Sequence, residues 1–169
     1  NSSKEAKAVK FLLKKKKINL VILRNKEKIN KNIQSQARKV RYKLLSNFCS
    51  KNKIKFILTG HHRDDQIETF LIRLSRGSGI QGLSAMKKVS NLNNKVKLLR
   101  PLLDEKKQDL AVFAKQYFGK IFKDPSNTNK RYLRTKIRSL IKQFEKSGIK
   151  RERIITSIHN LGSTRDTLN

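Results

Sequence analysis

Lys55-Phe-Ile-Leu-Thr-Gly-His-His-Arg-Asp-Asp-Gln-Ile-Glu-Thr69 is the stretch that decides the fold class of this chain. The apolar residues between Lys55 and Thr59 predict a short buried strand. Apolar residues at helical spacing predict a helix that begins near Asp64, with one face turned inward: Ile67, Phe70, Leu71 and Leu74. Polar side chains fill the junction, which is where open α/β sheets bind ligands. The stretch therefore predicts a sheet and a site at the carboxyl end of one strand.

The preceding residues repeat this order of elements. A first helix is expected between Ser3 and Lys14, and the apolar run Ile18 to Leu23 predicts a strand after it. A second helix is expected from Ile33 to Lys51, directly before the strand at Lys55. Two successive helix-then-strand units favour a mostly parallel sheet covered by helices, so we expect a three-layer α/β fold.

The character of the chain changes after Asp124. Before this residue, a strand is expected over 95–99 and an amphipathic helix over 104–118. After it no strand is expected, and there are two basic helical segments, 132–144 and 151–161. We therefore predict one α/β domain over residues 1–125 and a basic helical extension over residues 126–169.

Composition narrows the class of protein. The 169 residues carry 42 Lys and Arg against 12 Asp and Glu, a formal charge of +30. Such a charge favours a polyanionic partner such as nucleic acid, although a biased genome composition can also enrich Lys. No apolar run approaches the ~18 residues of a membrane span. One cysteine, Cys49, excludes an iron–sulfur cluster held within this chain and predicts a reducing, cytoplasmic location.

Imidazoles and carboxylates crowd the junction after the strand at Lys55. On a helix, His61 and Asp65 are four residues apart and Glu68 follows three later, so the three side chains can share one face. Such a cluster suits Mg²⁺ beside a triphosphate, or proton transfer. The alternative is that Asp64 and Asp65 only cap the helix and interact with its positive end. Zinc is not expected, because the spacing is not HExxH.

Two groups of arginines are candidates for binding phosphate. Arg38 and Arg41 lie three apart on the second predicted helix, while Arg134 and Arg138 lie four apart after a predicted turn at Asp124-Pro-Ser-Asn127. Paired guanidinium groups can bind phosphate oxygens. A solvated basic helix face is the alternative in both cases.

The segment Gly77-Ser-Gly-Ile-Gln-Gly82 matches G-x-G-x-x-G, yet it follows a predicted helix rather than a strand. A dinucleotide fingerprint must follow a strand and open a helix, so we reject that interpretation. A helix C-cap and turn is expected instead.

Together these motifs resemble the bacterial tRNA(Ile)-lysidine synthetase family, within the N-type ATP pyrophosphatase (PP-loop) superfamily. The histidine–aspartate motif followed by Arg-Gly-Ser-Gly is the specific part of the resemblance. The segments that carry it are Ala37 to Tyr42, Gly60 to Thr69, Arg76 to Leu83, Arg100-Pro-Leu-Leu103, and Asp124-Pro-Ser-Asn127 with Arg134 and Arg138. It implies an adenine nucleotide alpha hydrolase-like, Rossmann-like fold, and residues 1–125 would then be part of a PP-loop catalytic domain.

The resemblance also implies a reaction. An ATP-dependent ligase of this family adenylates the C2 carbonyl oxygen of the wobble cytidine (position 34) of tRNA(Ile) and releases pyrophosphate. The amine of L-lysine then displaces AMP and forms lysidine. ATP and Mg²⁺ are the implied cofactors, with Mg²⁺ expected near Asp65 and Glu68.

Residue roles follow from the same resemblance. The implied catalytic residues are Arg41, His61, Asp65 and Arg134. Those implied for ATP and its phosphates are Arg38, Arg41, His62 and Asp64. Those implied for tRNA are Arg131, Arg134 and Arg138.

The chain departs from the superfamily at one point, because the phosphate-binding loop Ser-Gly-Gly-x-Asp-Ser is absent. We therefore expect a fragment whose sheet is incomplete at its N-terminal edge and which is inactive alone, whereas the intact protein is expected to be a homodimer. Two alternatives stay open. One is a related tRNA cytidine 2-thiolation enzyme, which the single Cys49 disfavours; the other is a non-catalytic basic RNA-binding remnant.

Overall fold

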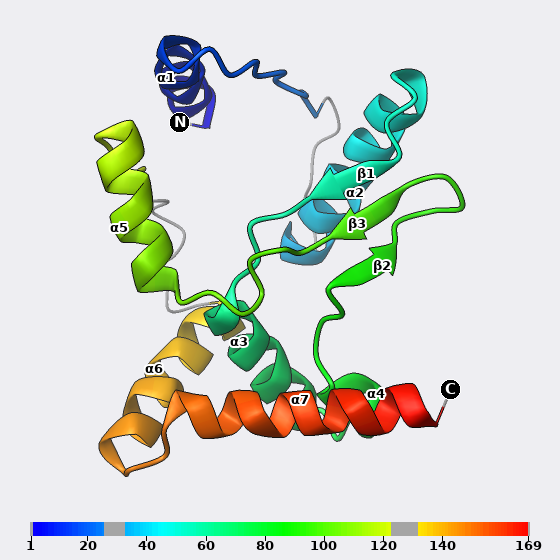
Figure 1. Cartoon of the computed structure of the whole chain (residues 1–169), viewed down its shortest axis with the longest axis vertical. Helices are drawn as coiled ribbons and strands as arrows, with labels where there is room; N and C mark the ends of the chain where they lie inside the picture. Colours follow the sequence, from blue (N-terminus) through cyan, green and yellow to red (C-terminus); the bar gives the residue numbers. More distant parts are fainter. Residues whose placement is uncertain (1, 26–32, 123–131, 169) are drawn as a thin grey trace. The chain divides into compact units, whose positions relative to one another are not determined.

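The computed structural model describes residues 2–25, 33–122 and 132–168 (Figure 1). Within these ranges no helix is both long and apolar enough to cross a membrane. The chain divides into two compact units. The first unit comprises residues 1–57 and 90–98, and the second comprises residues 58–89 and 99–169.

Two helices of the first unit occupy the ranges that their apolar spacing predicts. They are α1 (Ser2–Lys15) and α2 (Ile33–Lys51). In α2 the apolar positions from Ala37 to Phe48 are half-buried, and Cys49 is the buried residue of the helix. The chain leaves α2 through Lys53, whose φ of 56° is left-handed, and the Ile54 N–H donates to the Cys49 carbonyl at 2.8 Å.

The strand expected over Ile18 to Leu23 is absent, so this prediction was wrong. The segment has no regular secondary structure, and Ile18 and Val21 are 42% and 58% exposed. A strand exists through hydrogen bonds to a neighbouring strand, and none of the described strands pairs with this segment. β-branched residues alone therefore do not make a strand here.

Three short strands form one sheet in the order β1-β3-β2: β1 (Phe56–Leu58), β2 (Val89–Asn91) and β3 (Lys97–Leu99). β1 and β3 are parallel, because the Lys97 N–H donates to the Lys55 carbonyl and the Thr59 N–H donates to the Leu99 carbonyl. β2 and β3 form an antiparallel hairpin, since the Arg100 N–H donates to the Lys88 carbonyl. The sheet is therefore mixed, and the expected parallel arrangement holds for one of its two strand pairs.

The second unit is helical and holds the larger core. Its helices are α3 (Arg63–Leu74), α4 (Ile80–Leu83), α5 (Lys107–Phe118), α6 (Leu133–Lys146) and α7 (Arg151–Thr167). One apolar cluster joins α3, α6 and α7 with Ala85; its members are Ile67, Leu71, Ala85, Ile137, Ile141, Ile155 and Ile158. Ile67, Ile141 and Ile158 are exposed by no more than 2%. Burial of such side chains is the main force that holds these helices together.

The two helices after residue 125, α6 and α7, pack against α3, the helix that follows the histidine–aspartate turn. α6 and α7 both contact α3, and α7 also contacts α4 (Figure 1). By contrast, α5 contains no buried residue, and Phe113 is 62% exposed. Although a boundary at residue 125 remains a prediction about domains, the core of the second unit includes helices on both sides of it.

Candidate active site

The turn between β1 and α3 positions two histidines differently. The Thr59 hydroxyl lies 2.8 Å from His61 Nδ1, so His61 is tied back to the end of the strand. His62 has an extended backbone and is the N-cap residue of α3, and its N–H donates to Asp65 Oδ2 at 3.1 Å. Side-chain oxygens near the start of a helix commonly satisfy such N–H groups.

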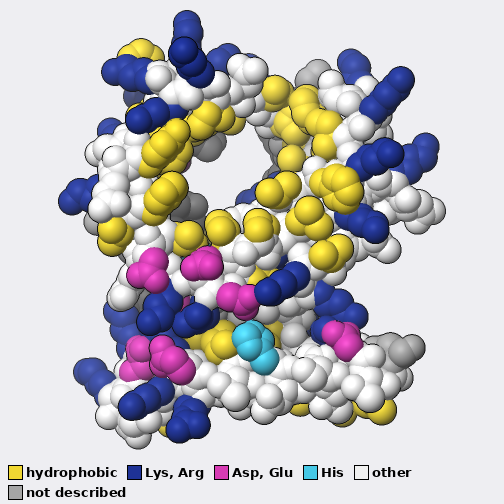
Figure 2. Space-filling view, viewed as in Figure 1, with side chains coloured by type: hydrophobic (Ala, Val, Ile, Leu, Met, Phe, Trp, Pro, Cys, Tyr) yellow, Lys and Arg dark blue, Asp and Glu magenta, His cyan; other side chains and the backbone are white. Residues whose placement is uncertain are grey.

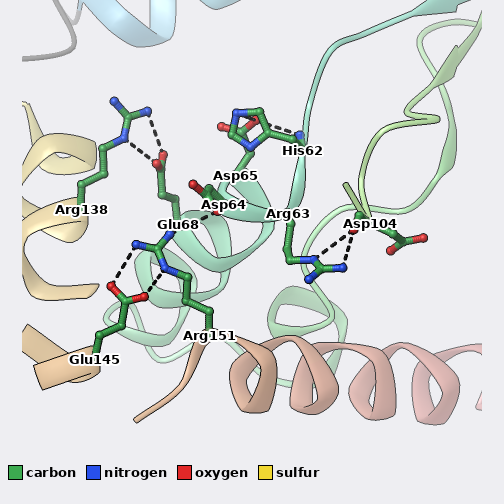
Figure 3. A network of polar contacts seen from close by, with 9 residues as sticks. All are labelled: His62, Arg63, Asp64, Asp65, Glu68, Asp104, Arg138, Glu145 and Arg151. Atoms are coloured by element: carbon green, nitrogen blue, oxygen red, sulfur yellow. Dashed lines mark hydrogen bonds and ion pairs between the residues drawn. The ribbon is translucent and has the colours of Figure 1, made fainter. Parts of the chain in front are cut away.

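His62 and Asp65 form an imidazole–carboxylate pair in this turn. His62 Nε2 lies 3.5 Å from Asp65 Oδ2, and the two side chains are 16% and 13% exposed. The other ring nitrogen, Nδ1, is buried and has no hydrogen-bond partner among the described residues. The sequence grouped His61 with Asp65, whereas the structure puts His62 beside this carboxylate (Figure 3).

The other two carboxylates of α3 are paired with arginines of the later helices (Figure 3). Glu68 is only 2% exposed and accepts hydrogen bonds from Arg138 of α6, with Nε at 2.5 Å and Nη2 at 3.4 Å. Arg151 of α7 lies 3.2 Å from Asp64, and it also donates to both oxygens of Glu145 at 2.6 and 3.1 Å. Asp65 is therefore the α3 carboxylate that no Lys or Arg pairs with among the described ion pairs.

These ion pairs change the acidity of their members. The pKa of Arg138 is raised, chiefly by its hydrogen bond to Glu68, although burial opposes this change. The pKa of Arg151 is raised, chiefly by its hydrogen bond to Glu145, and the same bond lowers the pKa of Glu145. All three groups consequently stay charged across the physiological pH range.

The beginning of α3 is also tied to the segment after β3. Arg63 donates from Nε and Nη2 to the Asp104 carbonyl at 3.0 and 2.6 Å. The Asp104 carboxylate pairs with Lys88 at 2.6 Å and lies 3.5 Å from His159 Nε2. Hydrogen bonding to Lys88 lowers the pKa of Asp104. The segment Arg100-Pro-Leu-Leu103 is part of this support, because Leu103 is buried and Arg100 donates to the Lys87 carbonyl at 2.7 Å.

The glycine-rich segment after α3 is a tight structural turn, as expected. Gly77 has a φ of +68°, and the Ser78 N–H donates to the Arg73 carbonyl. Arg73 also donates to the carbonyls of Gly82 and Ala85 at 2.7 and 2.9 Å. A Cβ at Gly82 would lie 2.6 Å from the Ser78 Cβ, so the close packing of this turn requires glycine there. The segment follows the helix α3, as predicted, and holds α4 against the end of α3.

The residues predicted from the sequence fall into two groups. Arg38 and Arg41 belong to the first unit: Arg38 lies 5.0 Å from the centre of the Tyr42 ring, and Arg41 lines a cavity of about 400 Å³ beside Val21 and Leu23. His61, His62, Asp64, Asp65, Arg134 and Arg138 belong to the second unit. Arg131, with Asp124 to Asn127, lies outside the described residues.

The two α6 arginines differ in their partners. Arg138 is engaged by Glu68, so its predicted contact with tRNA stays a prediction. Arg134, one turn earlier on α6, is half-buried and forms no hydrogen bond or ion pair with any described residue. Arg134 is therefore the α6 arginine whose guanidinium is available to an anion.

Sequence reasoning missed the ion pairs that support the site. The sequence places Glu68 in a cluster suited to Mg²⁺ or proton transfer, and it does not single out Arg151. The signal for Glu68 was its position on the apolar side of α3, between Ile67 and Leu71, where a carboxylate needs a cationic partner. No local signal identified Arg151, since its partners lie 87 and 6 residues away in the chain.

Comparison with known proteins assigns the chain to a class. Residues 1–144 match the PP-loop domain family, and the chain belongs to this family.

Among curated proteins, the chain is 46% identical over 135 residues to the tRNA(Ile)-lysidine synthase of Wolbachia pipientis wMel, a match that covers 79% of this chain and 31% of the relative. It is 47% identical over 116 residues to the tRNA(Ile)-lysidine synthase of Orientia tsutsugamushi (strain Boryong), covering 69% of this chain and 26% of that protein. The chain thus spans about a third of the length of the curated relatives that it matches.

A solved structure agrees with the fold. The U34-tRNA thiolase NcsA from Methanococcus maripaludis, determined with its 4Fe-4S cluster, superimposes with a TM-score of 0.69 over 93% of this chain and 55% of that chain. Sequence identity in this match is 21%, so it establishes the PP-loop fold and not the activity.

Proposed function

We propose that this chain is the nucleotide- and tRNA-handling part of a tRNA(Ile)-lysidine synthase. The proposed reaction joins L-lysine to C2 of the wobble cytidine of tRNA(Ile) at the expense of ATP, with AMP and pyrophosphate as products. The observation that supports it most is the similarity to curated tRNA(Ile)-lysidine synthases across the site helix α3. The proposal also includes the three-layer, mostly parallel sheet for the intact domain.

The pair of Asp65 and His62 suits the proton transfer that lysine ligation needs. The attacking amine must lose a proton when its nitrogen bonds to C2, and a carboxylate or imidazole can accept that proton. Asp65 has no Lys or Arg partner in the described ion pairs, and His62 Nδ1 has no hydrogen-bond partner there. We therefore assign proton acceptance to this pair, with His61 positioned through Thr59.

Arginines of both units suit the phosphates. Arg134 would contact the phosphates of ATP or tRNA, because its guanidinium forms no hydrogen bond or ion pair with the described residues. Arg38 and Arg41 are further candidates for binding phosphate, and Arg41 lines an apolar cavity of the first unit. Guanidinium groups balance the negative charge that develops when pyrophosphate leaves.

Mg²⁺ would fit the site if one carboxylate and the phosphates of ATP bound it together. Among the described residues no group of three or more His, Cys, Asp or Glu is arranged to hold a metal ion. Glu68 and Asp64 are engaged by arginines, which leaves Asp65 as the carboxylate for a cation, and His62 would then be the member of the pair that accepts the proton. Mg²⁺ commonly uses one or two carboxylates together with substrate phosphates, and there it would neutralise phosphate charge.

The compartment and assembly are part of the proposal. Burial raises the pKa of the Cys49 thiol, which favours the protonated form of this lone cysteine. We place the protein in the reducing cytoplasm, with the intact form a homodimer.

The test uses protein expressed from the complete reading frame that contains residues 1–169. It is incubated with ATP, Mg²⁺, isotope-labelled L-lysine and tRNA(Ile), and the nucleosides are analysed by mass spectrometry. We expect lysidine on the transcript with cytidine at position 34, and none on a transcript with uridine there. Asp65→Asn should lower the rate by roughly 100-fold, as expected for a proton acceptor. The matched control Asp109→Asn, at an exposed carboxylate of α5, should stay within about twofold of the unchanged protein.

Other outcomes separate the alternatives. Sulfur transfer to cytidine in place of lysine incorporation would identify a thiolation enzyme. Salt-dependent tRNA binding without AMP release would identify an RNA-binding remnant, and either result would overturn the proposal.

A further inference from the structure

Helix α7 lies beyond residues 1–144, which match the PP-loop domain, yet it supplies part of the core and an ion pair of the site helix. Its buried residues Ile155 and Ile158 join the apolar cluster with Ile67 and Leu71 of α3. Arg165, near its end, donates to the Ser84 hydroxyl at 2.6 Å. The helix therefore contacts the site helix α3 and, near its other end, the residue that ends α4.

Arg151 connects three elements at one end. Its guanidinium lies 3.2 Å from Asp64 at the start of α3 and donates to both oxygens of Glu145 on α6. Figure 3 shows it between these two carboxylates. The side chain is 28% exposed, so water screens these bonds only in part.

The position of Arg151 is not explained by helix preference. It is the first residue of α7, where the positive end of the helix dipole disfavours a cation. A cation is retained there because two carboxylates from other helices face it. Arg151 thereby fixes the Asp64 carboxylate, which lies next to Asp65 in the first turn of α3.

We propose that Arg151 is a positioning residue for the His62–Asp65 pair, and that α7 is thereby a component of the active site. Arg151 holds the first turn of α3 through Asp64, so that the Asp65 carboxylate stays on the N–H of His62. This inference rests on the proposed function for its catalytic meaning. Its test measures the turn directly and needs neither ATP nor tRNA, so the two can fail separately.

The experiment measures amide hydrogen exchange by NMR in the ¹⁵N-labelled chain and in Arg151→Gln. The His62 N–H, which donates to Asp65, should exchange roughly tenfold faster in Arg151→Gln, because a lost charge-assisted bond loosens the turn. Exchange of the core amides of Leu71 and Ile141 should stay within about twofold. The control Arg153→Gln removes an exposed cation from the same helix. The Arg153 side chain forms no ion pair with the described residues, so this change should leave the exchange rate of the His62 N–H unchanged.

Two further variants keep the test decisive. Asp64→Asn breaks the same pair from the other side and retains the bond between Arg151 and Glu145, so it should accelerate His62 exchange equally. The double variant should exchange at His62 little faster than either single variant, because the ion pair between Arg151 and Asp64 is removed in all three. Arg151→Lys should rescue the effect in part, since an ammonium can pair with one carboxylate but lacks the fork of Arg.

Unchanged His62 exchange in folded Arg151→Gln and Asp64→Asn would overturn the proposal. Equal acceleration at His62, Leu71 and Ile141 would also overturn it, because Arg151 would then serve only the stability of the helices.

Discussion

The two units of this chain use their apolar and charged residues in different ways. The first carries 20 Lys and Arg with 2 acidic residues, and the second carries 22 with 10. In Figure 2 acidic side chains gather over helices of the second unit, beside Lys and Arg. The ion pairs of Glu68 with Arg138, Asp64 with Arg151 and Asp104 with Lys88 lie within that unit. Its helices are therefore joined by paired charges as well as by a core, whereas the first unit presents unbalanced positive charge.

Burial differs in the same direction. Among the described residues of the first unit, the buried apolar side chains are Cys49, Val96 and Leu98, while Val21 and Phe56 are more than half exposed. The second unit buries seven residues in one cluster. Apolar residues at helical spacing find partners on neighbouring helices, but an apolar strand needs an adjacent strand before it can be buried. The comparison shows that composition alone does not decide which segment enters a core.

The largest expected effect comes from opening the core of the second unit. Ile158→Ala should lower the free energy of unfolding by about 3 kcal/mol, through lost burial and a cavity. Val21→Ala in the first unit should change it by less than about 0.5 kcal/mol, because Val21 is exposed. Urea unfolding of both variants measures the difference. Equal losses would contradict the contrast between the units.

The next effect concerns the buried carboxylate of α3. Glu68→Gln should destabilise the chain by about 2 kcal/mol, because Arg138 is left half-buried without its anionic partner. The matched change Glu152→Gln, at an exposed carboxylate of α7 that forms no ion pair with the described residues, should have little effect. Thermal unfolding can compare the two. An unchanged unfolding temperature in Glu68→Gln would mean that water replaces the carboxylate beside Arg138.

Much of the local structure could be predicted from the sequence. The ranges of α2 and α3 follow from apolar spacing, and the turn at Gly77 follows from a glycine after a helix end. β2 was missed because its three residues carry little apolar signal, although Asn93 next to it accepts hydrogen bonds from the N–H groups of Lys95 and Val96 and forms the turn. The strand at Ile18 was wrongly predicted because pairing is not encoded in the segment itself.

The site could be predicted only in part, for a similar reason. The histidine–aspartate motif identifies the turn, but which histidine faces Asp65 depends on the hydrogen bond of His61 to Thr59. Arg138 and Arg151 reach α3 from helices far along the chain. Sequence spacing gives neighbours on one helix, whereas it does not give partners across helices.

A smaller effect is expected on the salt dependence of tRNA binding, which should differ between the lysines of the two units. Replacing Lys14 and Lys15 of α1 by Gln should reduce the slope of log binding constant against log salt for tRNA by about 1.5, if each releases counterions from one phosphate. Replacing Lys142 and Lys146 of α6 should reduce it less, because nearby carboxylates already offset that surface. Filter binding at several salt concentrations measures both slopes. Identical slopes would show that the two units contribute equally to tRNA affinity.

The smallest expected effect is on acid stability. Lys88 lowers the pKa of Asp104 in the folded chain, so this carboxylate contributes stability above its unfolded pKa of about 3.9 and loses it as the pH falls through the folded value. Asp104→Asn should therefore remove a small part of the decline in stability at acidic pH. Urea midpoints between pH 7 and pH 3 provide the measurement. A decline identical to that of the unchanged chain would exclude Asp104 as a contributor.

The contact between Gly82 and Ser78 also limits how this segment can vary among sequences. Asn at position 77 is tolerable, because Asn adopts left-handed backbone more readily than most residues. A methyl group at position 82 meets the Ser78 Cβ at 2.6 Å, so Ala becomes acceptable there only when position 78 gives up its own side chain. Positions 78 and 82 should therefore covary among related sequences: where position 82 carries a side chain, position 78 should be glycine. Position 77 should vary independently of both.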